Sequence, residues 1–225
     1  MPEELQEKLQ KIKKKYTSKY NPLLWGIIER NIEYFLNDEF APCELLQLYS
    51  EMGIEHKYGN FYEAHLQKLK EHFDITKNII EVGAGYIPVF AKKVAHEQLK
   101  LGAGTITVYD PLLIPRRSNI KNMHIHRTKF KYNTRIKEFD LVVGIYPCNA
   151  TDVAIESACR NQKDFYIALC DCDQMGTGNP KTYHDYIIKR AESLLNVYDN
   201  GTLVVDTLGG SFKNPNPILY NRKNR

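Results

Sequence analysis

The segment that constrains the fold most is residues 78–95, where an apolar run ends in two closely spaced glycines. Residues 78–82 have the β-branched composition of a buried strand, and Gly83 and Gly85 follow almost at once. Residues 89–95 then show the apolar spacing of an amphipathic helix. A strand that turns into a helix through glycines lets a nucleotide-like ligand approach the backbone, and it points helix N–H groups at that ligand. The segment therefore predicts an α/β domain with a ligand site at the turn.

A second strand is expected at residues 105–109, and Asp110 stands at its carboxyl end. In folds of this type a carboxylate at that position binds ribose hydroxyls. A dinucleotide site would also need a third glycine three residues after Gly85, but this position is Pro88. NAD or FAD is therefore the less favoured ligand, and a purely structural glycine turn is the remaining alternative.

The run Glu81-Val82-Gly83-Ala84-Gly85 resembles the first motif of class I S-adenosylmethionine-dependent methyltransferases. The resemblance implies S-adenosyl-L-methionine as the cofactor, with its methionine and ribose parts at the glycines and its ribose hydroxyls at Asp110. The third glycine of that motif is replaced by Ile87 in this chain. After the third strand, Arg127-Thr128-Lys129 stands where many members carry an acidic or amide side chain for adenine. Either backbone and apolar contacts hold the adenine instead, or the cofactor binds weakly.

A second site follows the fourth and fifth strands, expected at residues 140–146 and 165–170. Their exits resemble a methyltransferase subgroup through Pro147, Cys148, Ala150, Thr151 and Asp152, and more loosely through Cys170 and Cys172. Carboxyl ends of parallel strands share one edge of a sheet, so both exits should lie near the glycines. We expect cofactor contacts from Glu81, Gly83, Ala84, Gly85, Tyr86, Asp110, Pro111, Tyr146 and Pro147, and acceptor-side contacts from Asn149 and Asp152.

Several of these residues have a structural alternative. Thr151 or Asn149 could cap the helix expected at residues 151–161, with Asp152 favourable against its dipole. If the acceptor needs deprotonation, Asp152 or Asp171 is the candidate base. Cys148 is expected to be a small, partly buried thiol rather than a nucleophile, because direct methyl transfer needs no covalent intermediate.

Zinc is a further hypothesis, because imidazole and thiolate are its usual ligands. The candidates are His124, His126, Cys148, Cys170 and Cys172. Neither the histidine pair nor the Cys170–Cys172 pair has the two-to-four-residue spacing of a zinc knuckle. The sequence therefore favours no metal.

The predicted fold is a Rossmann-like class I methyltransferase sheet, mostly parallel, with an antiparallel edge strand and helices on both faces. Strands alternate with helices from residue 75 to 225, with a closing strand pair at 202–207 and 217–220. Residues 1–74 read as an N-terminal helical cap of four helices, the fourth at about 60–73.

Charge and composition limit the partners and the cellular location that can be expected. A hydrophobic content of 43% is ordinary for a globular protein, and no apolar run reaches the roughly 18 residues of a membrane span. Five scattered cysteines and a start without an apolar secretory core predict a cytoplasmic protein. The net charge of +4 is mild, but residues 116–137 are strongly basic and contain Phe130 and Tyr132. RNA is therefore a possible acceptor beside a small molecule, and a solvated basic face is the alternative.

The preferred function is methyl transfer to an unidentified acceptor. Gly85-Tyr86-Ile87-Pro88 and the helical N-terminus also resemble nicotianamine-synthase-like enzymes, which would transfer the aminocarboxypropyl group of the same cofactor. A non-catalytic nucleotide- or S-adenosylmethionine-binding module is the third reading, because the chain has no Asn-Pro-Pro-Tyr catalytic tetrad. The oligomeric state does not follow from the sequence.

Overall fold

The computed structural model describes residues 7, 10, 43–52, 60–114, 119–172, 174–209 and 216–223. The chain divides into two compact units, Met1–Asn60 and Phe61–Arg225. In the first unit the described helix is α4 (Cys43–Met52), whereas the part of the expected helical cap before residue 43 lies almost wholly outside the described residues. The fourth expected helix is α5 (Phe61–His72), and it belongs to the second unit. The compact unit that contains the sheet thus begins at Phe61, with α5.

The second unit is built on one seven-stranded sheet with the order β3-β2-β1-β4-β5-β7-β6. The first five strands pair in parallel, β7 pairs antiparallel with both β5 and β6, and β6 therefore runs with the parallel set. This topology confirms the predicted methyltransferase-type sheet. The strands are β1 (Asn78–Val82), β2 (Thr105–Tyr109), β3 (Met123–His126), β4 (Leu141–Ile145), β5 (Asp164–Ala168), β6 (Thr202–Asp206) and β7 (Ile218–Arg222).

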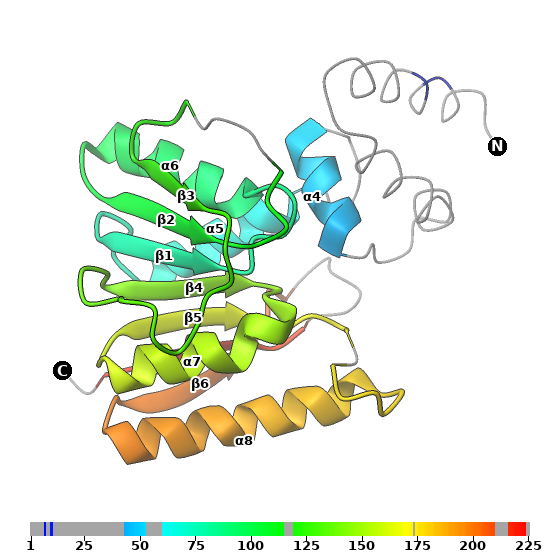
Figure 1. The fold of residues 1–225 in the computed structure, drawn as a ribbon, viewed down its shortest axis with the longest axis vertical. Helices are drawn as coiled ribbons and strands as arrows, with labels where there is room; N and C mark the ends of the chain where they lie inside the picture. The colour runs from blue at the N-terminus through cyan, green and yellow to red at the C-terminus, as the bar shows by residue number, and fades with distance from the viewer. Residues whose placement is uncertain are drawn as a thin grey trace. The chain divides into compact units, whose positions relative to one another are not determined.

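Helices cover both faces of the sheet (Figure 1). On one face lie α5 and α6 (Val89–Leu101), and on the other lie α7 (Thr151–Arg160) and α8 (Pro180–Tyr198). The helices begin and end where local chemistry dictates: the Asn179 side chain accepts from the Lys181 amide at the start of α8, and Gly102 ends α6 in the left-handed conformation. Among the described residues, no helix is long and apolar enough to span a membrane.

The α7 helix packs closely on β4 and β5 because it turns small residues inward. Ala154 and Ala158 are fully buried and join Ile155 and the strand residues Val142 and Phe165 in one apolar cluster. Burying side chains of the size of Ile155 and Phe165 contributes roughly 1.5–3 kcal/mol each. This core fixes the strand exits that carry the site.

Residues 127–140, between β3 and β4, form turns instead of a helix. Phe130, Ile136 and Phe139 from this segment are buried against the sheet. Beside them a hollow of about 1030 Å³ runs along β2 and β3, with Tyr109, His124 and Phe139 among its lining residues. The hollow lies over the face of these strands and not at the glycine turn.

Candidate functional site

The strand order reverses between β1 and β4, since the chain runs outward from β1 to β3 and then returns to the other side of β1. In open α/β sheets, ligands bind beyond the carboxyl ends of the strands at such a switch point. The residues that follow β1, β2 and β4 are the glycine turn, Asp110 and the Tyr146–Cys148 turn. The structure thus brings the two sequence motifs to one edge of the sheet, which we call the carboxyl edge.

Asp110 ties the glycine turn to the exit of β2. The Gly85 amide donates to Asp110 Oδ2 at 2.8 Å, and the Leu112 amide donates to Oδ1 at 2.7 Å. Burial raises the pKa of Asp110, and these two hydrogen bonds partly offset the effect. Each oxygen keeps a second lone-pair site, so the carboxylate can still accept from ribose hydroxyls. Asp110 therefore stands at its expected position, and it also holds the loop closed.

Glu81 lies at the other side of the turn, on the central strand β1, and is 2% exposed. Burial raises the pKa of Glu81 to about 8; a hydrogen bond from the Ala91 amide opposes the shift and the charge of Asp110 adds to it. Ala91 is in the first turn of α6, so the carboxylate satisfies a helix N–H that has no partner within the helix. Its Oε2 atom is buried without a hydrogen-bond partner among the described residues.

Gly83 is needed for packing as well as for the turn. Its φ is +75°, and a Cβ added to it would stand 2.5 Å from the Cα of Pro147. A Cβ on Gly144 would stand 2.8 Å from the Cγ of the same proline. The two glycines make room for Pro147, which is buried between β1 and β4. Gly83 thus faces protein, whereas Gly85, with a φ of 69°, is fixed by Asp110.

The turn after β4 has unusual backbone conformation. Tyr146 has a φ of 60° and Cys148 a φ of 49°, values that cost a residue with a side chain roughly 1–3 kcal/mol. The Tyr146 hydroxyl accepts from Asn216 Nδ2 at 2.9 Å, and its ring packs 5.1 Å from that of Phe61. These contacts hold the Tyr146 side chain in the protein interior.

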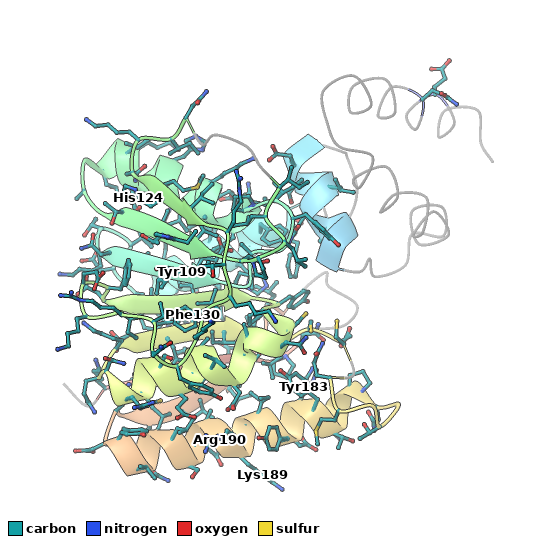
Figure 2. All side chains as sticks on the ribbon, viewed as in Figure 1. Tyr109, His124, Phe130, Tyr183, Lys189 and Arg190 are labelled. Atoms are coloured by element: carbon teal, nitrogen blue, oxygen red, sulfur yellow. The ribbon has the colours of Figure 1, made fainter. Side chains whose placement is uncertain are left out.

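The two predicted acceptor-side residues have different surroundings. Asn149 is exposed, in the short 3₁₀ turn η1 (Cys148–Ala150). Asp152 is engaged by its neighbours: Oδ1 accepts from Arg190 Nε at 3.2 Å, and Oδ2 accepts from the Tyr132 hydroxyl at 3.2 Å. Arg190 lies on α8, as Figure 2 shows, and it also pairs with Glu156 at 2.7 Å. Asp152 therefore joins α7, α8 and the 127–140 segment.

The remaining predicted residues lie around the turn. Ala84 is buried, the Tyr86 carbonyl accepts from the Ile114 amide, and Pro111 is exposed. The expected helix cap at Thr151 or Asn149 is wrong. The N-cap of α7 is Ala150, and the Thr151 hydroxyl donates backward to the Cys148 carbonyl because that carbonyl faces it at 2.7 Å.

The residues of the zinc hypothesis fall into two groups. His124 and His126 are exposed on β3, where His126 stacks on Tyr109. Cys148, Cys170 and Cys172 come together at the carboxyl edge, with all three sulfur atoms within 4.8 Å of one another. A hydrogen bond with Cys148 favours the Cys170 thiolate, but the bond with Cys172 and burial outweigh it and raise the pKa of Cys170 to about 12. The spacing of the cysteines in the sequence did not predict this cluster, because Cys148 follows β4 whereas Cys170 and Cys172 follow β5.

The basic segment keeps its charges on the surface, and of its two aromatic residues Tyr132 is exposed whereas Phe130 is buried. Phe130 is 7% exposed and packs edge-on against Tyr109, so its ring cannot stack on a base. Figure 2 labels both residues. Arg116 and Arg117 lie outside the described residues. The exposed cations are Lys121, Arg127, Lys129, Lys131, Arg135 and Lys137.

No protein-family model and no curated protein matches this sequence. Solved structures resemble it more distantly. A SAM dependent methyltransferase from Aquifex aeolicus is 13% identical with a TM-score of 0.47, covering 90% of this chain and 98% of that one. The Methanococcus jannaschii fibrillarin pre-rRNA processing protein is 14% identical with a TM-score of 0.41, covering 66% of this chain and 67% of that one. Human N-acetylserotonin methyltransferase in complex with SAM is 15% identical with a TM-score of 0.41, covering 89% and 67%. Structural similarity as low as this gives no information about the substrate. The fold is identified from the strand order of this chain.

Proposed function

We propose that the protein binds S-adenosyl-L-methionine at the carboxyl edge and transfers its methyl group to an acceptor. The observation that carries the proposal is the buried Oε2 of Glu81, which has no hydrogen-bond partner among the described residues and lies beside a glycine turn that Asp110 closes. S-adenosylmethionine brings an ammonium group and a sulfonium, and both are cations. An ammonium donor would satisfy the orphaned oxygen and favour the ionised form of Glu81.

The charge of Asp110 also disfavours a dinucleotide. NAD would bring two phosphate charges toward the turn that the Asp110 carboxylate closes. Like charges in a buried site disfavour one another strongly, since the local dielectric constant is low. Pro88, at the N-cap of α6, also occupies the place of the glycine that makes room for a pyrophosphate.

For methyl transfer the main task of the protein is to position the acceptor atom and the methyl group. An acceptor atom attacks the methyl carbon in line, the carbon–sulfonium bond breaks, and S-adenosylhomocysteine leaves as the neutral thioether. Of the predicted acceptor-side residues, Asn149 is the more available because its side chain is exposed. Asp152 would have to give up its bonds with Arg190 and Tyr132 to act as a base. If a base is needed, Asp152 and Asp171 are the two proposed candidates.

The acceptor is proposed as a small molecule or RNA, and salt dependence separates the two. The six exposed cations of residues 121–137 would bind phosphates, so RNA affinity should fall steeply between low and physiological salt. Absence of RNA binding at low salt would leave the small-molecule acceptor.

Product analysis tests the reaction itself. The protein is incubated with S-adenosylmethionine and panels of RNA and small nucleophiles, and the products are identified by mass spectrometry. Methyl transfer leaves S-adenosylhomocysteine, whereas aminocarboxypropyl transfer leaves methylthioadenosine. Tight cofactor binding without either product would favour the non-catalytic module.

A further inference from the structure

Three thiols from two different strand exits meet at the carboxyl edge. Cys148 follows β4, and Cys170 and Cys172 follow β5. Cys148 Sγ lies 3.5 Å from Cys170 Sγ and 4.0 Å from Cys172 Sγ. No disulfide joins these described cysteines.

The two distances from Cys148 match a tetrahedral metal site, and the third pair of sulfur atoms lies within 4.8 Å. With a zinc–sulfur distance of about 2.3 Å, two sulfur ligands at a tetrahedral angle stand about 3.8 Å apart. The two separations from Cys148 bracket that value at 3.5 and 4.0 Å. A disulfide would instead need its sulfurs at about 2.05 Å and would use only two of the three thiols. We propose that Cys148, Cys170 and Cys172 bind one zinc ion as thiolates.

The surrounding contacts hold the two turns in place. The Cys148 carbonyl accepts from Thr151 Oγ1 at 2.7 Å and from the Tyr183 hydroxyl at 3.2 Å. His184 Nε2 lies 2.8 Å from the Cys170 carbonyl oxygen. Tyr183, labelled in Figure 2, and His184 both come from α8. The positive φ of Cys148 is thus stabilised by neighbouring elements, as is common for residues that serve a site rather than the fold.

Zinc is the metal that best fits this ligand set. Thiolates select zinc, Cu(I) or iron–sulfur clusters, and zinc is stable with three cysteines and a fourth ligand such as water. Because Cys148 directly follows Pro147, the ion would join the β4 exit that packs on Gly83 to the exit of β5. This inference stands independently of the cofactor.

The test uses full-length, untagged protein expressed with added zinc and purified under reducing conditions. Elemental mass spectrometry should find about one zinc per chain. After exchange, Co²⁺ should give sulfur-to-cobalt charge-transfer absorption and the visible bands of a tetrahedral ion. Cys148→Ser, Cys170→Ser and Cys172→Ser should each weaken the metal by at least the roughly 10–100-fold that loss of an outer partner costs.

Cys159→Ala is the matched control, because Cys159 is buried in the α7 core cluster and is not one of the three thiols. It should keep the metal. Wild-type protein with neither zinc nor the cobalt absorption would overturn the proposal, and so would full metal content in all three serine variants. If a serine variant does not fold, cobalt titration of the wild-type chain decides by itself.

Discussion

Gly83 and Pro147 are in direct backbone contact across the carboxyl edge, so close that a Cβ at position 83 would lie 2.5 Å from the Pro147 Cα. The first glycine of the motif therefore makes room for protein atoms. The motif suggested that a ligand approaches the backbone at its glycines. At Gly83 the turn after β4 occupies that space instead. We therefore propose that ligand contact falls to Gly85, Asp110 and Glu81.

Gly83→Ala should destabilise the protein by roughly 3 kcal/mol or more, because the new methyl group meets Pro147 and the left-handed backbone disfavours any side chain. Gly102→Ala is the matched control: its φ is +71°, but a Cβ there meets nothing within 4 Å. Its cost should be only the backbone term of about 1–2 kcal/mol. Urea unfolding of both variants measures the difference, and equal losses would contradict the packing role of Gly83.

Glu81 should make stability depend on pH. Its pKa is about 8 in the folded protein against an ordinary 4.5, so the folded state holds the proton more tightly than the unfolded chain. The stabilisation is full below about pH 4.5 and is lost as the pH rises through about 8. Glu81→Gln should remove this slope, which is on the order of a few kcal/mol in total.

The Glu81 measurement is made as the difference between wild type and Glu81→Gln. Burial lowers the pKa of His65 to about 3, which changes stability in the opposite direction, from low pH upward. Because both proteins keep His65, its contribution cancels. Parallel curves of unfolding free energy from pH 5 to 8 would show that Glu81 is ionised in the folded state, and they would contradict the raised pKa of this carboxyl.

Asp110→Ala should weaken S-adenosylmethionine binding by about 1–3 kcal/mol, through lost charge-assisted hydrogen bonds. It also leaves the Gly85 and Leu112 amides without their acceptor, so the loop should become less ordered. Asp206→Ala is the control, since Asp206 is an unrelated carboxylate that pairs with Lys68. Unchanged cofactor affinity in Asp110→Ala would contradict the placement of the ribose.

Tyr146→Phe should lower stability by about 1 kcal/mol, since it removes the hydrogen bond from Asn216. Cofactor affinity should stay within a factor of about two, because the hydroxyl is turned to the protein interior. Calorimetric titration beside thermal unfolding separates the two effects. A large loss of affinity with unchanged stability would return Tyr146 to the cofactor contacts that the sequence suggested.

Asp152→Asn should cost only about 0.5–1.5 kcal/mol, because its pairing with Arg190 is partly exposed. Tyr132→Phe removes the other bond to the same carboxylate and serves as the control. Once an acceptor is known, the turnover of Asp152→Asn decides the role of this residue. A fall of about 100-fold or more with normal folding would make Asp152 the base after all.

The strands were predictable because their signal is local. A β-branched run that ends in glycines, such as residues 78–85, specifies both the strand and the turn. The helix expected at residues 151–161 agrees within one residue with α7. The closing strand pair was also confirmed as β6 and β7.

The site was harder to predict because its contacts join distant segments. The residues next to Gly83 in the sequence do not predict that Pro147 fills the space beside it. The burial of Phe130 depends on a β3–β4 connection without a helix, which alternation of polar and apolar residues does not reveal. The thiol cluster likewise needs the parallel pairing of β4 and β5 to bring Cys148 to Cys170.

Isothermal titration of the full-length protein with S-adenosylmethionine, S-adenosylhomocysteine and NAD tests the central claim most directly. We predict saturable binding of the first two at one site per chain, weakened by Glu81→Gln and by Asp110→Ala, and no binding of NAD. Selective binding of NAD, or no binding of either adenosyl compound, would contradict it.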